Sequence, residues 1–193
     1  GALDLEGNGF NSRLSPRGEG QSRTWIAGSL PGVTLNGPKG MAILGDTLFV
    51  ADIDCLRRFH RISREPLGDL CLDGVHFLND VASAPGGRLY FTDTGGEEAP
   101  GAVYLLRPSA DVPQTVILAD GTVLKGEELG GPNGVFADER GLYLATYRSG
   151  ELSRIAPDGD REQILPPSEL GLDGVTSTEE GAILVSSWGD SAV

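Results

Sequence analysis

The sequence is poor in basic residues. It carries 15 Lys and Arg against 28 Asp and Glu, which gives a formal net charge of −13. Binding to nucleic-acid phosphates requires clustered Lys and Arg, and anionic membrane surfaces attract the same residues. The charge balance therefore argues against both partners. An acidic chain can hold a cation, but the charge alone favours the plainer interpretation of a well-solvated surface.

The sequence also lacks any apolar stretch near the ~20 residues that a membrane-spanning helix needs. The residues that follow Gly1 do not show the pattern of a signal peptide, so we expect none in this stretch. We therefore expect no membrane span. The compartment stays open between the cytoplasm and a periplasmic or secreted location, and the oligomeric state is equally open.

Cysteine is scarce, with Cys55 and Cys71 as the two residues of this type. If 54–60 and 66–72 form a β-hairpin, these residues face each other across it, so a disulfide is geometrically possible. Two half-buried free thiols are the favoured interpretation. Two cysteines do not decide the compartment.

Histidine is equally scarce, with His60 and His76 as the two residues of this type. We expect both to be structural or surface residues, which disfavours a histidine-based transition-metal site. The chain also has no G-x-S-x-G motif, and this argues against a serine hydrolase.

Glycine, by contrast, is abundant: 29 of the 193 residues are Gly and 12 are Pro. They show no G-X-Y period, which excludes collagen, and they fall between short apolar runs. This punctuation is typical of an all-β chain with many turns. With 22% charged and 39% hydrophobic residues, the composition is globular, and the length suits one domain with a substantial core.

A similar segment recurs four times, at intervals of about 40 to 55 residues. Its copies begin PKGMAILGDTLFV, LNDVASAPGGRLYF, PNGVFADERGLYLAT and LDGVTSTEEGAILV. In the third copy, GVFAD, LYLATY, ELSRIA and REQIL read as four short strands separated by turns. Four short strands per repeat at this period are typical of a β-propeller blade. A β-sandwich would not repeat so regularly, and a parallel β-helix would have a shorter repeat, so we predict an all-β propeller.

The strand pattern divides the chain among blades. We assign residues 1–34 to the end of a first blade, 35–75 to a second, 76–130 to a third, 131–170 to a fourth and 171–193 to the start of a fifth. A propeller ring closes with roughly four to eight blades, and an open ring leaves bare strand edges. We therefore expect this single domain to be an incomplete part of a longer ring.

A polar residue stands at the start of the innermost strand in each repeat: Lys39, Asn79, Asn133 and Asp173. The starts of inner strands meet at one mouth of a propeller channel, so these side chains should surround a shared axis. The amide oxygens of Asn79 and Asn133 and the carboxylate of Asp173 suit Ca²⁺, or less cleanly Mg²⁺ or Zn²⁺. The alternative is that these residues stand there only as turn formers.

In these segments the chain resembles the SMP-30/gluconolactonase/LRE family of six-bladed β-propellers, and more loosely the paraoxonases. The resemblance runs over essentially the whole chain and is most specific in FLNDVASAPGGRLYFTDTG, GGPNGVFAD and LGLDGVTS. It implies one divalent cation at the channel centre, with Ca²⁺ favoured, held by Asn79, Asn133, Asp173 and a Glu from the first blade. It places Lys39 in the blade that supplies no ligand. We expect the missing Glu on an inner strand that this chain lacks.

The family's members hydrolyse lactones and related esters, so the resemblance implies such a substrate here. Asp173 is then the candidate general base that activates water, beside a cation that polarises the carbonyl. The residues expected at the substrate rim are Lys39, Asp93, Thr94, Tyr147, Arg148 and Trp188.

Two other functions stay open. One is a non-catalytic propeller that binds a ligand or a protein, and the other is a strictosidine-synthase-like propeller, which lacks this metal set. A protein-binding propeller should expose an apolar or aromatic patch at the mouth. The sequence predicts a polar mouth, with Trp188 as the main exception.

Overall fold

The computed structural model describes residues 6–17, 21–97, 99–107, 114–115 and 124–189. Within them the chain forms five antiparallel sheets and two single-turn 3₁₀ helices, η1 (Pro85–Gly87) and η2 (Glu127–Leu129). No helix in this part of the chain has the length and hydrophobicity to traverse a bilayer. The all-β class predicted from the sequence is confirmed.

The five sheets follow one another along the chain, and we call them blades one to five. Blades one and five are strand pairs, β1 (Phe10–Arg13) with β2 (Ser22–Ala27) and β16 (Leu172–Ser177) with β17 (Ile183–Ser187). The strands of the larger blades are β3 (Met41–Leu44), β4 (Thr47–Asp52), β5 (Cys55–His60) and β6 (Pro66–Cys71) in blade two; β7 (Leu78–Ala84), β8 (Arg88–Asp93), β9 (Gly101–Leu106), β10 (Gln114–Thr115) and β11 (Lys125–Gly126) in blade three; and β12 (Pro132–Asp138), β13 (Gly141–Thr146), β14 (Leu152–Ile155) and β15 (Arg161–Leu165) in blade four.

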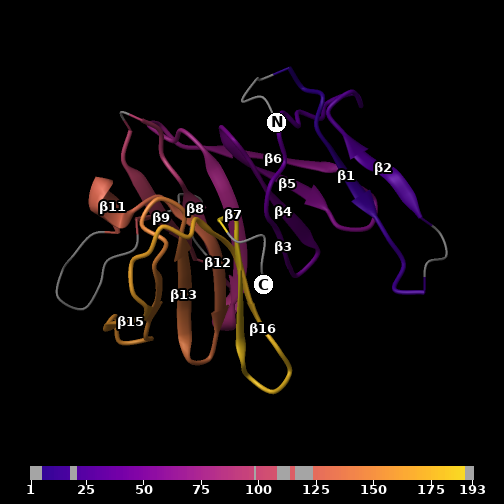
Figure 1. Ribbon diagram of the computed structural model, residues 1–193. Coiled ribbons are helices and arrows are strands. Elements are labelled where there is room, and N and C mark those ends of the chain that lie inside the picture. The colour runs from indigo at the N-terminus through magenta and orange to yellow at the C-terminus, as the bar shows by residue number, and fades with distance from the viewer. Residues whose placement is uncertain (1–5, 18–20, 98, 108–113, 116–123, 190–193) are drawn as a thin grey trace.

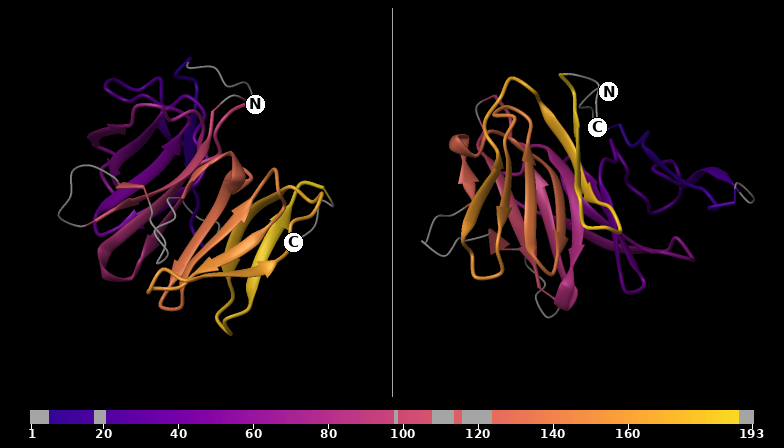
Figure 2. Two further views of the ribbon diagram at one scale, coloured as in Figure 1. Left: turned by 90° about the vertical axis from the view of Figure 1, so that its left-hand side faces the viewer. Right: turned by 60° about the horizontal axis from the view of Figure 1, so that its bottom comes forward.

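The first strands of the blades lie next to one another. Strand β7 packs against β3 on one side and β12 on the other, and β12 packs against β16. Figures 1 and 2 show the blades standing side by side, with their later strands away from these inner ones. This is the blade arrangement of a β-propeller, and it brings the starts of the inner strands together.

Apolar side chains fill the seams between neighbouring blades. Leu56, Leu78 and Phe91 lie between blades two and three and are fully shielded from solvent. Val103 and Leu124 are equally buried between blades three and four. Burying one such side chain is worth about 1.5–3 kcal/mol, so these seams hold the inner strands in fixed relative positions.

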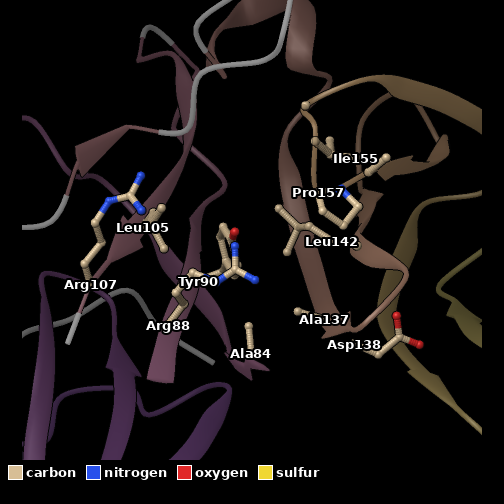
Figure 3. A pocket seen from close by; sticks show the side chains of 13 residues that line it. Ala84, Arg88, Tyr90, Leu105, Arg107, Ala137, Asp138, Leu142, Ile155 and Pro157 are labelled. Carbon is tan, nitrogen blue, oxygen red and sulfur yellow. The ribbon is translucent and has the colours of Figure 1, made fainter. Parts of the chain in front are cut away.

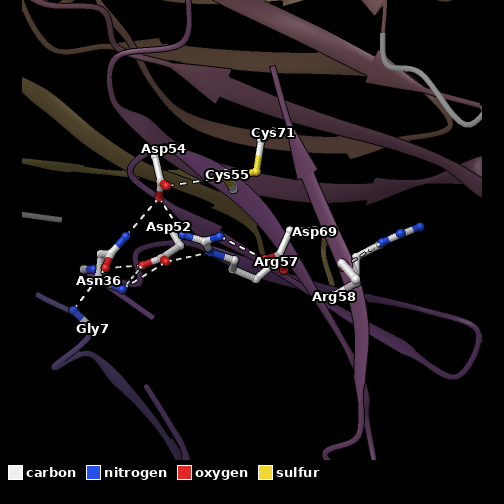
Figure 4. Close-up of polar contacts among 11 residues, drawn as sticks. Gly7, Asn36, Asp52, Asp54, Cys55, Arg57, Arg58, Asp69 and Cys71 are labelled. Atoms are coloured by element: carbon white, nitrogen blue, oxygen red, sulfur yellow. Dashed lines mark hydrogen bonds and ion pairs between the residues drawn. A yellow bond between two sulfur atoms is a disulfide. The ribbon is translucent and has the colours of Figure 1, made fainter. Parts of the chain in front are cut away.

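A buried arginine organises the polar side of blade two (Figure 4). The guanidinium of Arg57 bonds the carboxylates of Asp52 at 2.9 Å, Asp54 at 2.6 Å and Asp69 at 3.0 Å. One oxygen of Asp52 also accepts the backbone N–H of Asn36 at 2.8 Å. The cluster therefore ties the chain before β3 to the ends of β4 and β6.

Cys55 and Cys71 form a disulfide between β5 and β6 (Figure 4). The preference for two free thiols was therefore wrong. The register explains the bond, because the two residues are direct partners across the hairpin with their Cα atoms 4.3 Å apart. The link joins the outer pair of strands in blade two.

Candidate functional site

The inner strands of blades three, four and five each begin with a break in regular pairing. The register between inner strand and neighbour shifts across the segment that contains Asn79, Asn133 or Asp173. Such an irregularity leaves residues out of the hydrogen bonding between the strands and changes the direction of their side chains. A cavity of about 610 Å³ lies where these strand starts meet, and Lys39 of blade two lines it too. The structure thus brings all four of these residues together at one site.

The two asparagine amides have defined orientations. The Nδ2 group of Asn79 donates to Thr94 Oγ1 at 3.0 Å, and that of Asn133 donates to the carbonyl of Leu172 at 3.1 Å. No hydrogen bond within the described residues occupies either Oδ1 atom. Each amide therefore presents its oxygen, and not its nitrogen, as the free polar atom at the cavity.

Asp173 contributes the third oxygen group. Its carboxylate lines the cavity and accepts no hydrogen bond from the part of the chain that the structure describes. The described residues contain no group of three or more His, Cys, Asp and Glu that could hold a metal ion. The donor set is instead mixed, with the amide oxygens of Asn79 and Asn133 beside a carboxylate. An all-oxygen set of this kind fits a hard cation such as Ca²⁺ better than a softer metal.

Asp80 is a cavity residue that the sequence analysis did not select. Blades two, four and five carry glycine directly after the cavity residue, and blade three carries Asp80 there. Its Oδ1 accepts the N–H of Val81 at 2.8 Å, and its Oδ2 accepts the N–H of Val135 in β12 at 2.9 Å. The side chain therefore bridges the inner strands of blades three and four. The departure from the glycine pattern was the signal that could have identified it.

The ionisation of Asp80 is strongly perturbed. Burial raises its pKa from 3.8 to about 6, and the neighbouring Asp173 carboxylate contributes in the same direction. The hydrogen bonds from Val135 and Val81 oppose this rise because they favour the charged form. Burial is the main cause of the rise, and a cation bound nearby would favour the charged form of Asp80 again.

Lys39 supplies a positive charge on the blade-two side of the cavity. Its Nζ lies 5.4 Å from the centre of the Phe77 ring, within range of a cation–π contact. It forms no ion pair with the described residues. The ammonium is therefore available to an acidic group that enters the cavity.

Thr94 and Arg148 also line the cavity, but their polar groups are committed to the protein. The hydroxyl of Thr94 donates to the carbonyl of Pro132 at 2.6 Å while it accepts from Asn79. Arg148 donates to the carbonyls of Thr94 and Gly96, each at 3.0 Å. Both residues were expected at the substrate rim, and the structure gives them a bracing role between blades three and four.

Asp93 is not among the residues that line the cavity. Its side chain is fully buried, and its oxygens accept the backbone N–H groups of His76 at 3.1 Å, Phe77 at 2.8 Å and Gly95 at 2.9 Å. The expectation that Asp93 belongs to the substrate rim is therefore corrected. Its carboxylate therefore fixes the loop that precedes β7 and the loop that follows β8.

The mouth of the cavity is more aromatic than the sequence analysis expected. Phe77, Tyr147 and Trp188 all line it. Tyr147 is 47% exposed and Trp188 is 68% exposed. The rim can therefore receive an apolar or ring-shaped group above the oxygen donors.

Comparisons with known proteins support the fold. No family model matches the chain, and no curated protein matches it. Among solved structures, virginiamycin B lyase from Staphylococcus aureus superposes with a TM-score of 0.63 at 13% identity, over 93% of this chain and 56% of the lyase. A gluconolactonase from Xanthomonas campestris superposes with a TM-score of 0.60 at 22% identity, over 80% and 57%. A chain of the nidogen/laminin complex superposes with a TM-score of 0.60 at 16% identity, over 78% of this chain and 56% of that one.

The chain folds as a β-propeller. The likeness to these structures carries the fold alone, because every one of these identities lies at or below 22%. The chain spans little more than half the length of each of these propellers.

Proposed function

We propose that the cavity binds one divalent cation and catalyses the hydrolysis of a small lactone or ester. The observation that carries the proposal is the orientation of the two amides. Both Nδ2 groups of Asn79 and Asn133 are held by protein acceptors, so both oxygens remain for a ligand. With the Asp173 carboxylate they form three oxygen donors from three blades around one cavity.

Calcium is the proposed cation, with Mg²⁺ and Zn²⁺ as less suitable alternatives. Ca²⁺ accepts carboxylate and amide oxygens together with water in a flexible shell. No Glu lines the cavity in the part of the chain that the structure describes, so water or substrate would complete the shell beside Asn79, Asn133 and Asp173. A bound cation would polarise the scissile carbonyl and stabilise the oxyanion that forms on attack.

Asp173 is proposed as the general base. Its carboxylate is free of hydrogen bonds from the described residues, whereas both oxygens of Asp80 are occupied by backbone donors. Asp173 would take one proton from water as the water oxygen bonds the carbonyl carbon. The same proton would then pass to the leaving oxygen as the carbon–oxygen bond breaks, which yields a hydroxy acid or an acid and an alcohol.

The rim suggests the kind of substrate. Lys39 would pair with an acidic group, since its ammonium has no ion-pair partner among the described residues. Tyr147 and Trp188 present exposed rings that can cover an apolar or cyclic portion. The cavity volume of about 610 Å³ suits a small molecule. A gluconolactonase among the structural neighbours is consistent with a small-molecule substrate.

The test measures hydrolysis of glucono-1,5-lactone and phenyl acetate by pH-stat titration, with calcium and with chelator. Asp173→Asn keeps the size of the side chain but removes the base, so kcat should fall at least ~100-fold. Asp160→Asn is the matched control, because Asp160 is an exposed turn residue of blade four. Equal turnover by Asp173→Asn and the wild type would remove Asp173 from the reaction. Turnover unaffected by chelator would remove the cation.

A binding function without catalysis is the second candidate, favoured by the aromatic rim of Phe77, Tyr147 and Trp188. It predicts that the wild type and Asp173→Asn bind a lactone equally and that neither converts it. Mass spectrometry after incubation in ¹⁸O-labelled water completes the distinction, because hydrolysis incorporates one labelled oxygen and binding alone incorporates none.

A further inference from the structure

A second hollow lies between blades three and four, remote from the cavity described above (Figure 3). Its volume is about 300 Å³. Ala84 and Ala137, near the ends of β7 and β12, line it, whereas Asn79 and Asn133 stand at the starts of the same strands. At about 3.3 Å per residue, five or so residues of strand separate the two hollows by roughly 15 Å. We call this second hollow the lower cleft.

Small residues keep the lower cleft open. Higher in the same seam, Val103 and Val135 fill the space between the blades. Toward the cleft, Ala84 and Ala137 supply only methyl groups. Gly141 has no side chain to fill the cleft, and a side chain at this position would overlap the carbonyl of Ile155.

Apolar side chains form part of both walls of the lower cleft, although most of the surface that lines it is polar. Tyr90 and Leu105 line it from blade three, and Leu142, Ile155 and Pro157 line it from blade four. Figure 3 shows these two groups facing each other across the gap. Leu105, Leu142 and Ile155 are themselves nearly buried. These side chains can contact the apolar part of a small ligand, and the polar part of the lining can contact its polar group.

Positive charge is concentrated on the blade-three side of the cleft. Arg88 uses its Nε to bond the carbonyl of Pro85 at 3.0 Å, and its remaining donors have no partner among the described residues. Arg107 has no described ion-pair or hydrogen-bond partner. The one carboxylate in the lining, Asp138, is held by Arg140 at 2.7 Å. The cleft therefore carries surplus positive charge, although the chain as a whole has a net charge of −13.

We propose that the lower cleft binds a small amphipathic carboxylate. The guanidinium groups of Arg88 and Arg107 match a carboxylate in charge and in planar geometry. The apolar body would lie between Tyr90 on one wall and Leu142 and Ile155 on the other. A volume of about 300 Å³ is at the small end of ligand pockets and admits a body of one or two rings. The proposal is independent of the hydrolase proposed above.

The test uses 1-naphthoate as the probe and its neutral analogue 1-naphthamide as the matched ligand. Binding to the full chain is followed by methyl NMR of Leu142 and Ile155. Naphthoate should shift these methyl signals with a dissociation constant below about 1 mM, and the amide should bind at least tenfold more weakly. Arg107→Gln, which removes no described contact, should weaken naphthoate binding severalfold. Arg88→Gln combined with Arg107→Gln should abolish binding, and Arg17→Gln, an exposed arginine of blade one, should leave it unchanged.

Three results would overturn the proposal. They are equal binding of naphthoate and naphthamide, unchanged affinity in Arg107→Gln, and shifts of the aromatic ring signals of Phe77 and Trp188 in place of the methyl signals of Leu142 and Ile155. The last result would place the ligand in the upper cavity. Loss of hydrolysis in Asp173→Asn bears on that cavity alone, so the two proposals succeed or fail separately.

Discussion

At the scale of single residues, the pKa of the Asp80 carboxyl group is the property that the fold changes most. Burial raises its pKa from 3.8 to about 6, with help from Asp173. The folded protein therefore binds this proton more tightly than the unfolded chain does. The contribution of Asp80 to stability is greatest below about pH 4 and is lost as the pH rises to about 6. A shift of this size corresponds to about 3 kcal/mol.

The expected consequence is a difference between the wild type and Asp80→Asn that depends on pH. Relative to Asp80→Asn, which cannot titrate, the wild type should lose up to about 3 kcal/mol of unfolding free energy between pH 4 and pH 6.5. Urea unfolding with chelator in every buffer measures this, since a bound cation would lower the pKa again. Parallel stability curves for the two proteins would show that Asp80 titrates normally.

At the scale of elements, the seam between β12 and β16 depends on the absence of a side chain. An added Cβ at Gly134 would overlap the carbonyl oxygen of Asp173 and crowd Gly174. Gly134→Ala should therefore destabilise the fold by about 1–3 kcal/mol, as overpacking does. It should also move Asp173 relative to Asn133 and so weaken cation binding.

The control for this change is Gly96→Ala. A side chain at Gly96 would first meet Ala99 at 3.6 Å, an ordinary contact distance. Urea unfolding and a calcium titration of both variants make the comparison. If Gly134→Ala were as stable as Gly96→Ala, the inner strands would not be packed as closely as the structure shows.

The strands themselves were predictable from the sequence. The runs GVFAD, LYLATY, ELSRIA and REQIL contain most of β12, β13, β14 and β15, because turn residues mark both ends of each run. The gathering of Asn79, Asn133 and Asp173 could be predicted from their common place at the start of inner strands. Such a placement depends only on strand order, which repeats reveal.

The direction of the polar side chains after the second strand of each blade could not be predicted in the same way. The sequence places several polar residues there but does not say which of them points at the cavity. Asp93 turns inward because three backbone N–H groups bind its carboxylate. Asp52 holds the equivalent place at the end of β4, where it accepts the N–H groups of Asn36 and Gly37. A repeated aspartate at this position was the available sign of an architectural role.

At the scale of the whole molecule, a cation at the cavity would join blades three, four and five. Its proposed donors, Asn79, Asn133 and Asp173, come from β7, β12 and β16, so binding in the folded state should stabilise the entire arrangement. A cation present at one hundred times its dissociation constant adds about 2.7 kcal/mol. For a chain of this size, that gain raises the melting temperature by roughly 5–10 °C.

Because the net charge is −13, any added salt should also raise the melting temperature, since it reduces the self-repulsion of an acidic protein. The decisive comparison is therefore calcium against sodium chloride at equal ionic strength, in the wild type and in Asp173→Asn. The wild type should gain several degrees from calcium beyond the effect of sodium chloride, and chelator should reverse the gain. Asp173→Asn should respond to the two salts alike. If calcium stabilised both proteins equally, the effect would be general screening, and the three blades would not share a bound cation.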